Sequence, residues 1–395
     1  MRVLQICSKP PLPAIDGGCL ASYQLSKNLL KAGFEVSLIS LATEKHPYLP
    51  DEIDKDYSNE VNLDILSVKT ALKPAAVFVN LFENKSIQEH RFYHHAFAKK
   101  LVQSIRSHAF DFIVFDGLLS CVYARDVRKA CKAKMIYRSH NAEHSIFEQR
   151  KELEKNLLKK FYLNAQAARI MRFEMSIWNS MDAVLSISSN DIDTMKRCGI
   201  NRENTKVLPF GVEVNEAVAT PKKNTLFHLG AMDWEPNIAG VKWFVKEVWP
   251  MVHTSHPETE LHLGGKNITA VKHDLIGEGI EIHELVPDAT TFTEAFDILI
   301  VPIHTGSGIR IKVLQAMAAG NVVVSTEKGL EGIDVEDGKQ VLIANEADSF
   351  ARCLKRLCTD NEYKETLRTN ARAFIKRMHH PDGLSEQLKN WMIQL

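Results

Sequence analysis

The sequence predicts an α/β protein made of two doubly wound domains, each built on a mostly parallel sheet with helices on both faces. Short, continuous apolar runs alternate with helical patterns along almost the whole chain, which is typical of parallel strands buried on both faces. The runs form two series, separated by residues 209–224, a stretch with prolines, a glycine and polar residues but no clear period. A chain of 395 residues is also long for one core and ample for two.

The first series of apolar runs predicts the strands of an N-terminal domain over residues 1–210. These runs are Val3–Cys7, Val36–Leu41, Leu63–Val68, Phe112–Phe115, Met135–Tyr137, Val184–Ile187 and Val207–Leu208. The second series predicts a C-terminal domain over residues 211–377. Its runs are Leu226–Leu229, Leu261–Leu263, Ile280–Ile282, Ile298–Val301, Val322–Val324 and Val341–Ile343.

Residues 378–395 predict a C-terminal helix with Leu388, Trp391 and Met392 on one face. We expect this helix to pack back on the N-terminal domain. In open α/β sheets, ligands bind beyond the carboxyl ends of the strands. We therefore expect the two domains to face each other across one cleft.

Composition narrows the class of function. The formal net charge is zero, which argues against a nucleic-acid binder. Residues 1–205 nevertheless carry 29 Lys and Arg against 23 Asp and Glu, an excess that fits an anionic acceptor, a membrane surface or simply uneven solvated faces. The seven cysteines include no Cys-x-x-Cys pair, and no apolar run is long enough to span a membrane. We therefore expect reduced thiols and a cytoplasmic protein.

The most informative segment lies in the second half of the chain. A predicted strand, Ile298–Ile303, runs into the small-residue turn Gly306–Gly308, and a predicted helix, Ile309–Ala319, follows at once. Glycines let the backbone approach a ligand closely, and the N–H groups of a helix start attract an anion. Arg310 and Lys312 add two positive charges there. This pattern predicts a phosphate site, most simply for the diphosphate of an activated metabolite.

Residues 145–181 predict one long helix or a helix pair that mixes basic and aromatic side chains. These side chains are Lys155, Lys159, Lys160, Arg169 and Arg172 among Phe161, Tyr162, Phe173 and Trp178. A face that touches a membrane is one interpretation. Packing on one side and a solvated face on the other explain the pattern equally well.

Six segments together resemble the family 4 (group 1) glycosyltransferases, which are retaining enzymes of the GT-B fold. In chain order they are Pro10–Gly18, Arg138–Asn141, Ser186–Asp191, Pro209–Val212, Leu229–Asn237 and Gly306–Thr326. The resemblance implies a GT-B-like fold and metal-independent transfer of a sugar, with anomeric retention, from a UDP- or GDP-linked donor to a saccharide or lipid-linked acceptor. It implies no further cofactor. Such enzymes assemble surface polysaccharides or glycolipids, in the cytoplasm or at the cytoplasmic face of the membrane.

The resemblance also implies roles for individual residues. His140, which ends a strand, is expected to contact the transferred sugar, and Arg310 and Lys312 are expected to stabilise the leaving diphosphate. The residues expected to bind the donor are Gly17, Gly18, Gly230, Asp233, Ser307, Gly308, Ile309, Gln315 and Glu331. Those expected on the acceptor side are Asp116, Asn141 and Glu143.

The chain departs from the family at two acidic positions. The family commonly has two glutamates separated by seven residues, where this chain has Ser307 and Gln315. Glutamine still accepts a hydrogen bond from a ribose hydroxyl, but without charge. Residues two apart on a helix point about 200° apart, so Arg310 and Lys312 reach one diphosphate only if Arg310 lies at the junction of loop and helix. A nucleotide-sugar epimerase and a non-catalytic nucleotide-sugar binder remain alternatives.

Overall fold

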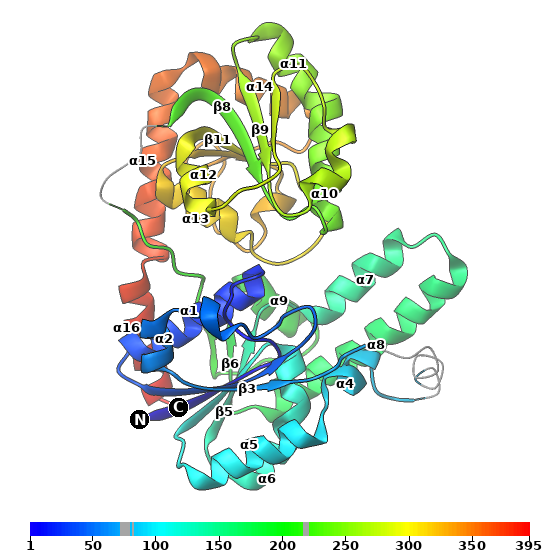
Figure 1. Ribbon diagram of the computed structural model, residues 1–395, viewed down its shortest axis with the longest axis vertical. Helices are drawn as coiled ribbons and strands as arrows, with labels where there is room; N and C mark the ends of the chain where they lie inside the picture. Colours follow the sequence, from blue (N-terminus) through cyan, green and yellow to red (C-terminus); the bar gives the residue numbers. More distant parts are fainter. Residues whose placement is uncertain (72–79, 81–82, 216–220) are drawn as a thin grey trace. The chain divides into compact units, whose positions relative to one another are not determined.

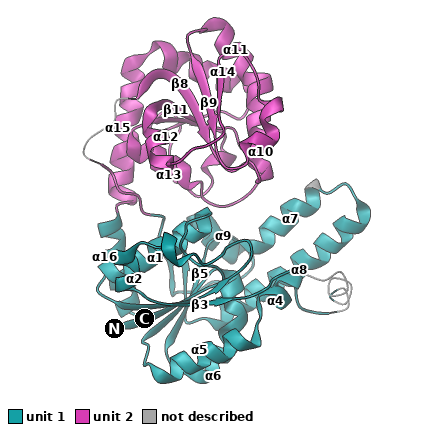
Figure 2. Cartoon of the chain, viewed as in Figure 1, with its two compact units in different colours: residues 1–210, 381–395 teal, residues 211–380 magenta. Residues whose placement is uncertain are grey.

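The computed structural model describes residues 1–71, 80, 83–215 and 221–395 (Figure 1). Residues 216–220, inside the connection expected at 209–224, lie outside this description. The chain forms two compact units: unit 1 contains Met1–Phe210 and Pro381–Leu395, and unit 2 contains Gly211–His380 (Figure 2). The final helix therefore belongs to unit 1, and unit 2 continues slightly past the boundary expected at residue 377.

Unit 1 contains a seven-stranded sheet in the order β3-β2-β1-β4-β5-β6-β7, and every neighbouring pair is parallel. The strands are β1 (Arg2–Cys7), β2 (Glu35–Ala42), β3 (Asn62–Ser67), β4 (Phe112–Asp116), β5 (Lys134–Ser139), β6 (Ala183–Ser186) and β7 (Thr205–Val207). The sequence order reverses on the two sides of β1, which places the β1–β4 junction at a topological switch point, where open α/β sheets bind ligands.

Helices cover both faces of this sheet (Figure 1). They are α1 (Gly17–Lys31), η1 (Pro50–Glu52), α2 (Lys55–Glu60), α4 (Ile87–Phe92), α5 (His95–Ser107), η2 (Leu118–Tyr123), α6 (Ala124–Ala130), α7 (Glu143–Leu153), α8 (Leu157–Ser180), α9 (Ser189–Arg197) and α16 (Pro381–Ile393). On one face, Leu384 and Leu388 of α16 share a buried core with Leu25 and Leu29 of α1. On the other face, helices α5, α6 and α8 pack in a second core that contains Trp178.

Unit 2 repeats this architecture with six strands in the order β10-β9-β8-β11-β12-β13, again all parallel. The strands are β8 (Lys222–Leu229), β9 (Glu260–Gly264), β10 (Ile280–His283), β11 (Phe296–Val301), β12 (Val322–Ser325) and β13 (Leu342–Ile343). The helices are α10 (Glu235–Trp243), η3 (Phe244–Val248), α11 (Trp249–Ser255), η4 (Ile268–Asp274), α12 (Ala289–Ala295), α13 (Ile311–Ala319), η5 (Lys328–Leu330), α14 (Ala347–Thr359) and α15 (Asn361–Met378).

A buried ion cluster fastens α15 to this sheet. The Asp297 carboxylate of β11 is fully buried; it accepts from Lys364 Nζ at 2.9 Å and also pairs with Arg368. The same carboxylate accepts from the backbone N–H of Asn224 at 3.1 Å. The pairing of these charged groups offsets part of the cost of removing them from water.

The structure confirms the α/β fold class with two doubly wound parallel sheets, and each predicted apolar run contributes to a strand. The prediction for the start of the phosphate-site helix was wrong by two residues, because α13 begins at Ile311 and Ile309 lies in the preceding loop. Residues 145–181 fall mostly within the helix pair α7 and α8. Among the described residues, no helix combines the length and apolarity required to cross a membrane.

Candidate active site

Two glycines shape the loop that leads into α13. Gly306 and Gly308 have φ values of +92° and +93°, a left-handed conformation that glycine adopts without a steric penalty. A Cβ atom on Gly306 would also lie 2.8 Å from a ring atom of Trp234. The loop can therefore press against Trp234 only because residue 306 has no side chain.

Arg310 lies at the junction of this loop with the helix. It is the N-cap residue of α13 and only 6% of its surface is exposed. Its guanidinium carbon lies 4.9 Å from the centre of the Trp234 ring, and Nη1 donates to the carbonyl of Gly308. The buried Nε and Nη2 atoms have no hydrogen-bond partner among the described residues. Burial lowers the pKa of Arg310 to about 10, so the group stays charged at neutral pH with two donors available to a ligand.

Lys312 extends from the first turn of α13 to the carboxyl end of β8. Its Nζ donates to Nε2 of His228 at 3.2 Å and to Oδ1 of Asn237 at 3.3 Å. The His228 ring accepts at Nε2 because its Nδ1–H donates to the Ile300 carbonyl at 3.0 Å. Burial, and then the charge of Arg310, lower the pKa of Lys312 to about 7. The effect of the Arg310 charge on Lys312 indicates that the two cations lie near each other.

Gly230 follows β8 directly and leaves room for this arrangement. A Cβ atom there would lie 2.8 Å from Nδ2 of Asn237 and 2.9 Å from Nε2 of His228. Both groups hold Lys312, so a side chain at 230 would displace them. Burial, and then the nearby Lys312, keep the pKa of His228 well below its ordinary value, and the ring is therefore a neutral acceptor.

The other residues predicted to bind the donor are half-buried or exposed. Ser307 and Ile309 are half-buried in the loop, and Asp233 is exposed. Glu331 pairs with Lys328 at 2.8 Å, while its second carboxylate oxygen is buried without a partner among the described residues. Gln315 is exposed and lines a cavity of about 240 Å³ together with Arg372. Neither Arg310 nor Lys312 lines that cavity, although Gln315 follows Lys312 by three residues on α13.

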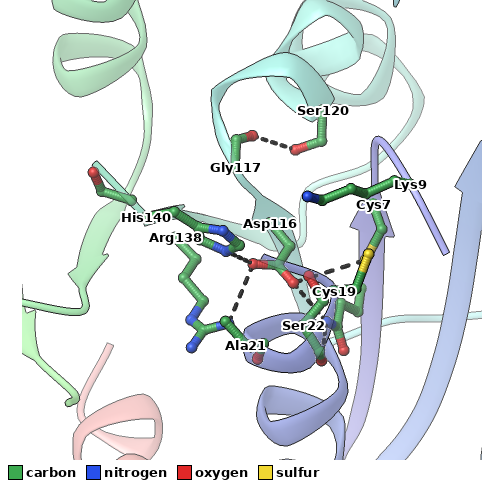
Figure 3. Close-up of polar contacts among 12 residues, drawn as sticks. Cys7, Lys9, Cys19, Ala21, Ser22, Asp116, Gly117, Ser120, Arg138 and His140 are labelled. Carbon is green, nitrogen blue, oxygen red and sulfur yellow. Dashed lines mark hydrogen bonds and ion pairs between the residues drawn. The ribbon is translucent and has the colours of Figure 1, made fainter. Parts of the chain in front are cut away.

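A second polar cluster lies in unit 1 at the switch point of the sheet. Asp116 ends β4 and His140 follows β5, and His140 Nε2 lies 2.5 Å from Oδ1 of Asp116 (Figure 3). The same oxygen accepts from Arg138 Nη1 at 3.3 Å, and Oδ2 accepts from Gln5 Nε2 at 2.8 Å. Burial acts to raise the pKa of Asp116, but His140 and Arg138 outweigh it and hold that pKa below its ordinary value.

This geometry favours a supporting role for Asp116 over the acceptor contact expected from the resemblance. Its side chain is fully buried and surrounded by protein donors, so an acceptor cannot reach the carboxylate. Asp116 instead fixes the ring of His140, whose side chain keeps 16% of its surface exposed. Because Nε2 faces Asp116, Nδ1 is the other ring nitrogen through which His140 can contact a ligand.

Asn141 and Glu143 lie just beyond His140. Glu143 begins α7, and both it and Asn141 are half-buried. The backbone N–H of Glu143 donates to the buried carboxylate of Glu174 at 3.0 Å. Burial, and then repulsion from Glu174, raise the pKa of Glu143 to about 7. Glu143 can therefore gain or lose a proton near neutral pH.

Gly17 and Gly18, which were expected to bind the donor, lie in the first turn of α1. The Asp16 carboxylate caps this helix by accepting from the N–H of Cys19 at 2.9 Å. Lys9 Nζ lies 2.6 Å from the same carboxylate, and a Cβ atom on Gly18 would lie 2.7 Å from Lys9 Nζ. The absence of a side chain at Gly18 thus makes room for Lys9.

Sequence reasoning missed Lys9, His228 and Asn237 as parts of these clusters. Each lies within two residues of β1 or β8 or at the start of α10, where side chains reach the ligand-binding edge of a sheet. Position alone could have suggested them. Their partners depend on how strands and helices pack, which a single sequence does not reveal.

Comparison with known families decides the class of the protein. The family model "Glycosyltransferase Family 4" matches residues 20–216, and the model "Glycosyl transferases group 1" matches residues 223–360. The chain belongs to the family 4 (group 1) glycosyltransferases. A relative from Klebsiella pneumoniae, "Uncharacterized 44.6 kDa protein in cps region", is 23% identical over 391 residues, which cover 95% of each chain.

Solved structures confirm the GT-B fold of this glycosyltransferase. Sucrose-phosphate synthase from Thermosynechococcus elongatus matches with a TM-score of 0.74 at 15% identity, over 100% of this chain and 99% of that one. HepE from Anabaena in complex with UDP matches with a TM-score of 0.68 at 14% identity, over 100% of both chains. At such low identity the likeness establishes the fold and leaves the substrate to the chemistry of the site.

Proposed function

We propose that this glycosyltransferase moves a hexosyl group, with anomeric retention, from a nucleotide-diphosphate donor bound by unit 2 to an acceptor hydroxyl. The observation that carries the proposal is the cation pair at the start of α13. Nε and Nη2 of Arg310 are buried without partners among the described residues. Among the described residues, the hydrogen-bond partners of Lys312 are the neutral groups His228 and Asn237. A diphosphate supplies the missing acceptors, and it adds negative charge to that of Glu331, whose carboxylate already acts on Arg310.

The same pair would drive the chemical step. As the bond between the anomeric carbon and the diphosphate oxygen breaks, negative charge grows on the leaving group. Arg310 and Lys312 are already oriented by Trp234 and His228, so they stabilise that charge without reorganising. One preorganised donor of this kind contributes about 3–4 kcal/mol to catalysis. Because two fixed cations perform the electrostatic work, we expect no metal requirement.

In unit 1, we propose that His140 contacts the transferred sugar. Asp116 holds the ring through Nε2, so Nδ1 is the atom available to accept a hydrogen bond from a sugar hydroxyl. Asn141 and Glu143, half-buried beside it, are proposed to contact the acceptor. Glu143 is suited to receive a proton because burial, and then Glu174, raise its pKa to about 7.

We favour a UDP-linked donor and a role in surface polysaccharide assembly. HepE, of similar fold, has been solved with UDP and with UDP-glucose, and the Klebsiella relative is described as a protein of a cps region. A GDP-linked donor is the main competitor. Ser307 and Gln315 would replace the charged ribose contacts of the family with neutral ones.

We also propose a peripheral membrane contact at the turn between α7 and α8. The exposed fractions of Leu157, Leu158 and Phe161 are 81%, 83% and 72%. Lys155, Lys159 and Lys160 are exposed among them. Apolar side chains flanked by lysines fit an anionic lipid surface, as a lipid-linked acceptor requires.

Donor binding and turnover can be tested directly. UDP-, GDP- and ADP-sugars are compared for the increase in melting temperature they give, because binding to the native state stabilises it. Nucleotide release is then followed with and without acceptor, and NMR identifies the product anomer. Arg310→Ala should lower turnover at least 100-fold, while the exposed Arg352→Ala in the same unit should not. Equal activity of Arg310→Ala and wild type would refute the site.

The two alternatives predict different results in the same assays. An epimerase would convert the donor sugar without any acceptor. A non-catalytic binder would be stabilised by the donor but would release no nucleotide.

The membrane contact is tested by flotation with vesicles that contain phosphatidylglycerol. Flotation should be lost in Leu158→Glu/Phe161→Glu and retained in Ile276→Glu, which changes an exposed isoleucine of unit 2. Flotation that is independent of these residues would exclude this contact.

A further inference from the structure

Two neighbouring strands of unit 2 carry the same short pattern, Glu-x-His. It occurs as Glu260 and His262 on β9 and as Glu281 and His283 on β10. The strands are parallel, and Glu281 lies directly beside His262 in the register. Side chains two residues apart share a face of a sheet. The two patterns therefore bring two imidazoles and two carboxylates together at one edge of the sheet.

The candidate ligand atoms of His262, Glu281 and His283 lie within 4.8 Å of one another. His262 Nδ1 lies 3.0 Å from His283 Nε2 and 3.3 Å from Oε2 of Glu281. His283 Nε2 lies 3.7 Å from Oε1 of Glu281. Ligand atoms about 2.0–2.1 Å from a tetrahedral zinc ion are separated by about 3.3 Å. The three separations scatter around that value, and the two that involve Glu281 join different oxygens of its carboxylate. A small rotation of this exposed carboxylate would give the spacing of a three-ligand zinc site.

The surroundings fix the rings in the orientation that a metal needs. Glu260 accepts from His262 Nε2 at 3.1 Å, so the proton of a neutral ring is on Nε2 and the lone pair of Nδ1 points at the shared centre. A carboxylate behind a ligating histidine is the usual outer support of a zinc site. Lys222 Nζ lies 2.5 Å from the same carboxylate and keeps Glu260 in place.

Aromatic packing holds the same two imidazoles. The ring of His262 stacks on Phe296 with centroids 4.1 Å apart, and His283 meets the edge of Phe292 at 5.0 Å. His262 is buried, but Glu281 keeps 63% of its side chain exposed. The exposed carboxylate gives an ion a route of entry and leaves one side of the centre open to water.

We propose that Nδ1 of His262, Nε2 of His283 and a carboxylate oxygen of Glu281 bind one zinc ion, with water in the fourth position. Two imidazoles and a carboxylate favour zinc and the later divalent transition metals over magnesium, which prefers oxygen ligands. The ion would tie the edge strand β10 to β9. It stabilises unit 2 and does not depend on the proposed donor site.

The competing explanation is a metal-free hydrogen bond from His283 Nε2–H to Nδ1 of His262. Zinc titration distinguishes the two. The full-length protein, freed of any affinity tag and treated with a chelator, is titrated with Zn²⁺ against a chromophoric competitor. We expect one ion per chain with micromolar or tighter affinity, and a visible absorption band when Co²⁺ is used instead. We also expect Zn²⁺, but not Mg²⁺, to raise the melting temperature.

Variants assign the binding to this cluster. His283→Ala should weaken zinc binding at least tenfold and abolish the increase in melting temperature. Glu260→Gln, which removes only the outer support, should weaken binding about 10–100-fold. His273→Ala is the matched control, because that histidine is 76% exposed in η4 of the same unit. Millimolar binding by the wild type, or equal binding by wild type and His283→Ala, would overturn the proposal.

Discussion

Nζ of Lys312 donates to Nε2 of His228 across 3.2 Å, and the imidazole can accept there because its Nδ1–H is committed to the Ile300 carbonyl. A neutral ring thus orients the amine without adding a negative charge that would compete with phosphate. Burial, followed by Arg310, lowers the pKa of the amine to about 7. Lys312 is therefore about half protonated at neutral pH before an anion binds.

This relationship predicts that UDP binding weakens as the pH rises above about 7. A bound diphosphate favours the charged amine and raises its pKa, so binding takes up a proton when the free amine is neutral. The affinity for UDP reaches its maximum below the pKa of free Lys312, which is about 7. Above that pKa, the affinity falls by up to about tenfold per pH unit. Calorimetric titrations with UDP between about pH 7 and 9 measure the slope.

Lys312→Met provides the control for that titration. The variant should bind UDP more weakly near neutral pH and lose most of the slope between about pH 7 and 9, because the titrating amine is gone. A slope equal to that of the wild type would assign the pH dependence to another group.

Gly306→Ala should impair donor binding by moving Trp234. The φ of +92° is unfavourable for alanine, and the new Cβ would lie 2.8 Å from the Trp234 ring that supports Arg310. We expect a loss of about 1–3 kcal/mol in stability and weaker UDP binding by calorimetry. Gly383→Ala is the control: it lies in α16, and a Cβ there would meet nothing within 4 Å. Normal UDP affinity in Gly306→Ala would contradict the role of the loop.

The losses of turnover caused by Asp116→Asn and His140→Ala should not be additive. The buried carboxylate orients His140 at 2.5 Å, and misplacing a catalytic group by about 1 Å can cost about 100-fold in rate. We expect each variant to lose most of the turnover and the double variant to lose little more than His140→Ala alone. Steady-state rates of the four proteins give the coupling. Additive losses would mean that Asp116 acts elsewhere.

Asp297→Ala should destabilise unit 2. The substitution leaves Lys364, which is only 2% exposed, without its partner, and breaking a buried pair in this way costs about 3–5 kcal/mol. Urea unfolding should show an earlier midpoint for the variant. Glu247→Ala removes an exposed partner of Lys246 and should change stability by less than about 0.5 kcal/mol. Similar midpoints for the two variants would refute the importance of the buried cluster.

The sheets were predictable because the central strands, such as β4, β11 and β12, are buried on both faces. Such strands appear as unbroken runs like Val322–Val324, which stand out without reference to any partner. The first residues of the helices were harder to predict from the sequence. No Ser, Thr, Asp or Asn lies between Gly308 and Ile311 to mark a cap, and Arg310 takes the N-cap position without a side-chain hydrogen bond to the N–H groups of the helix.

The segment that forms the candidate site could be predicted from the sequence. The residues that its side chains contact could not. Glycines and cations around Arg310 indicated an anion site from local spacing alone. The burial of Asp116 depends on Gln5 from β1 and Arg138 from β5, residues that meet only in the assembled sheet. The support of Lys312 by His228 likewise requires α13 to pack across β8, and no local pattern encodes that contact.

The polypeptide leaves unit 1 after Phe210 and returns to it at Pro381. Leu384, Leu388 and Met392 then complete a core begun by Leu25 and Leu29. During synthesis, part of the apolar core of the first 210 residues therefore stays exposed until the last stretch of chain leaves the ribosome. A premature stop shortly before Pro381 would harm the half of the enzyme that was made first.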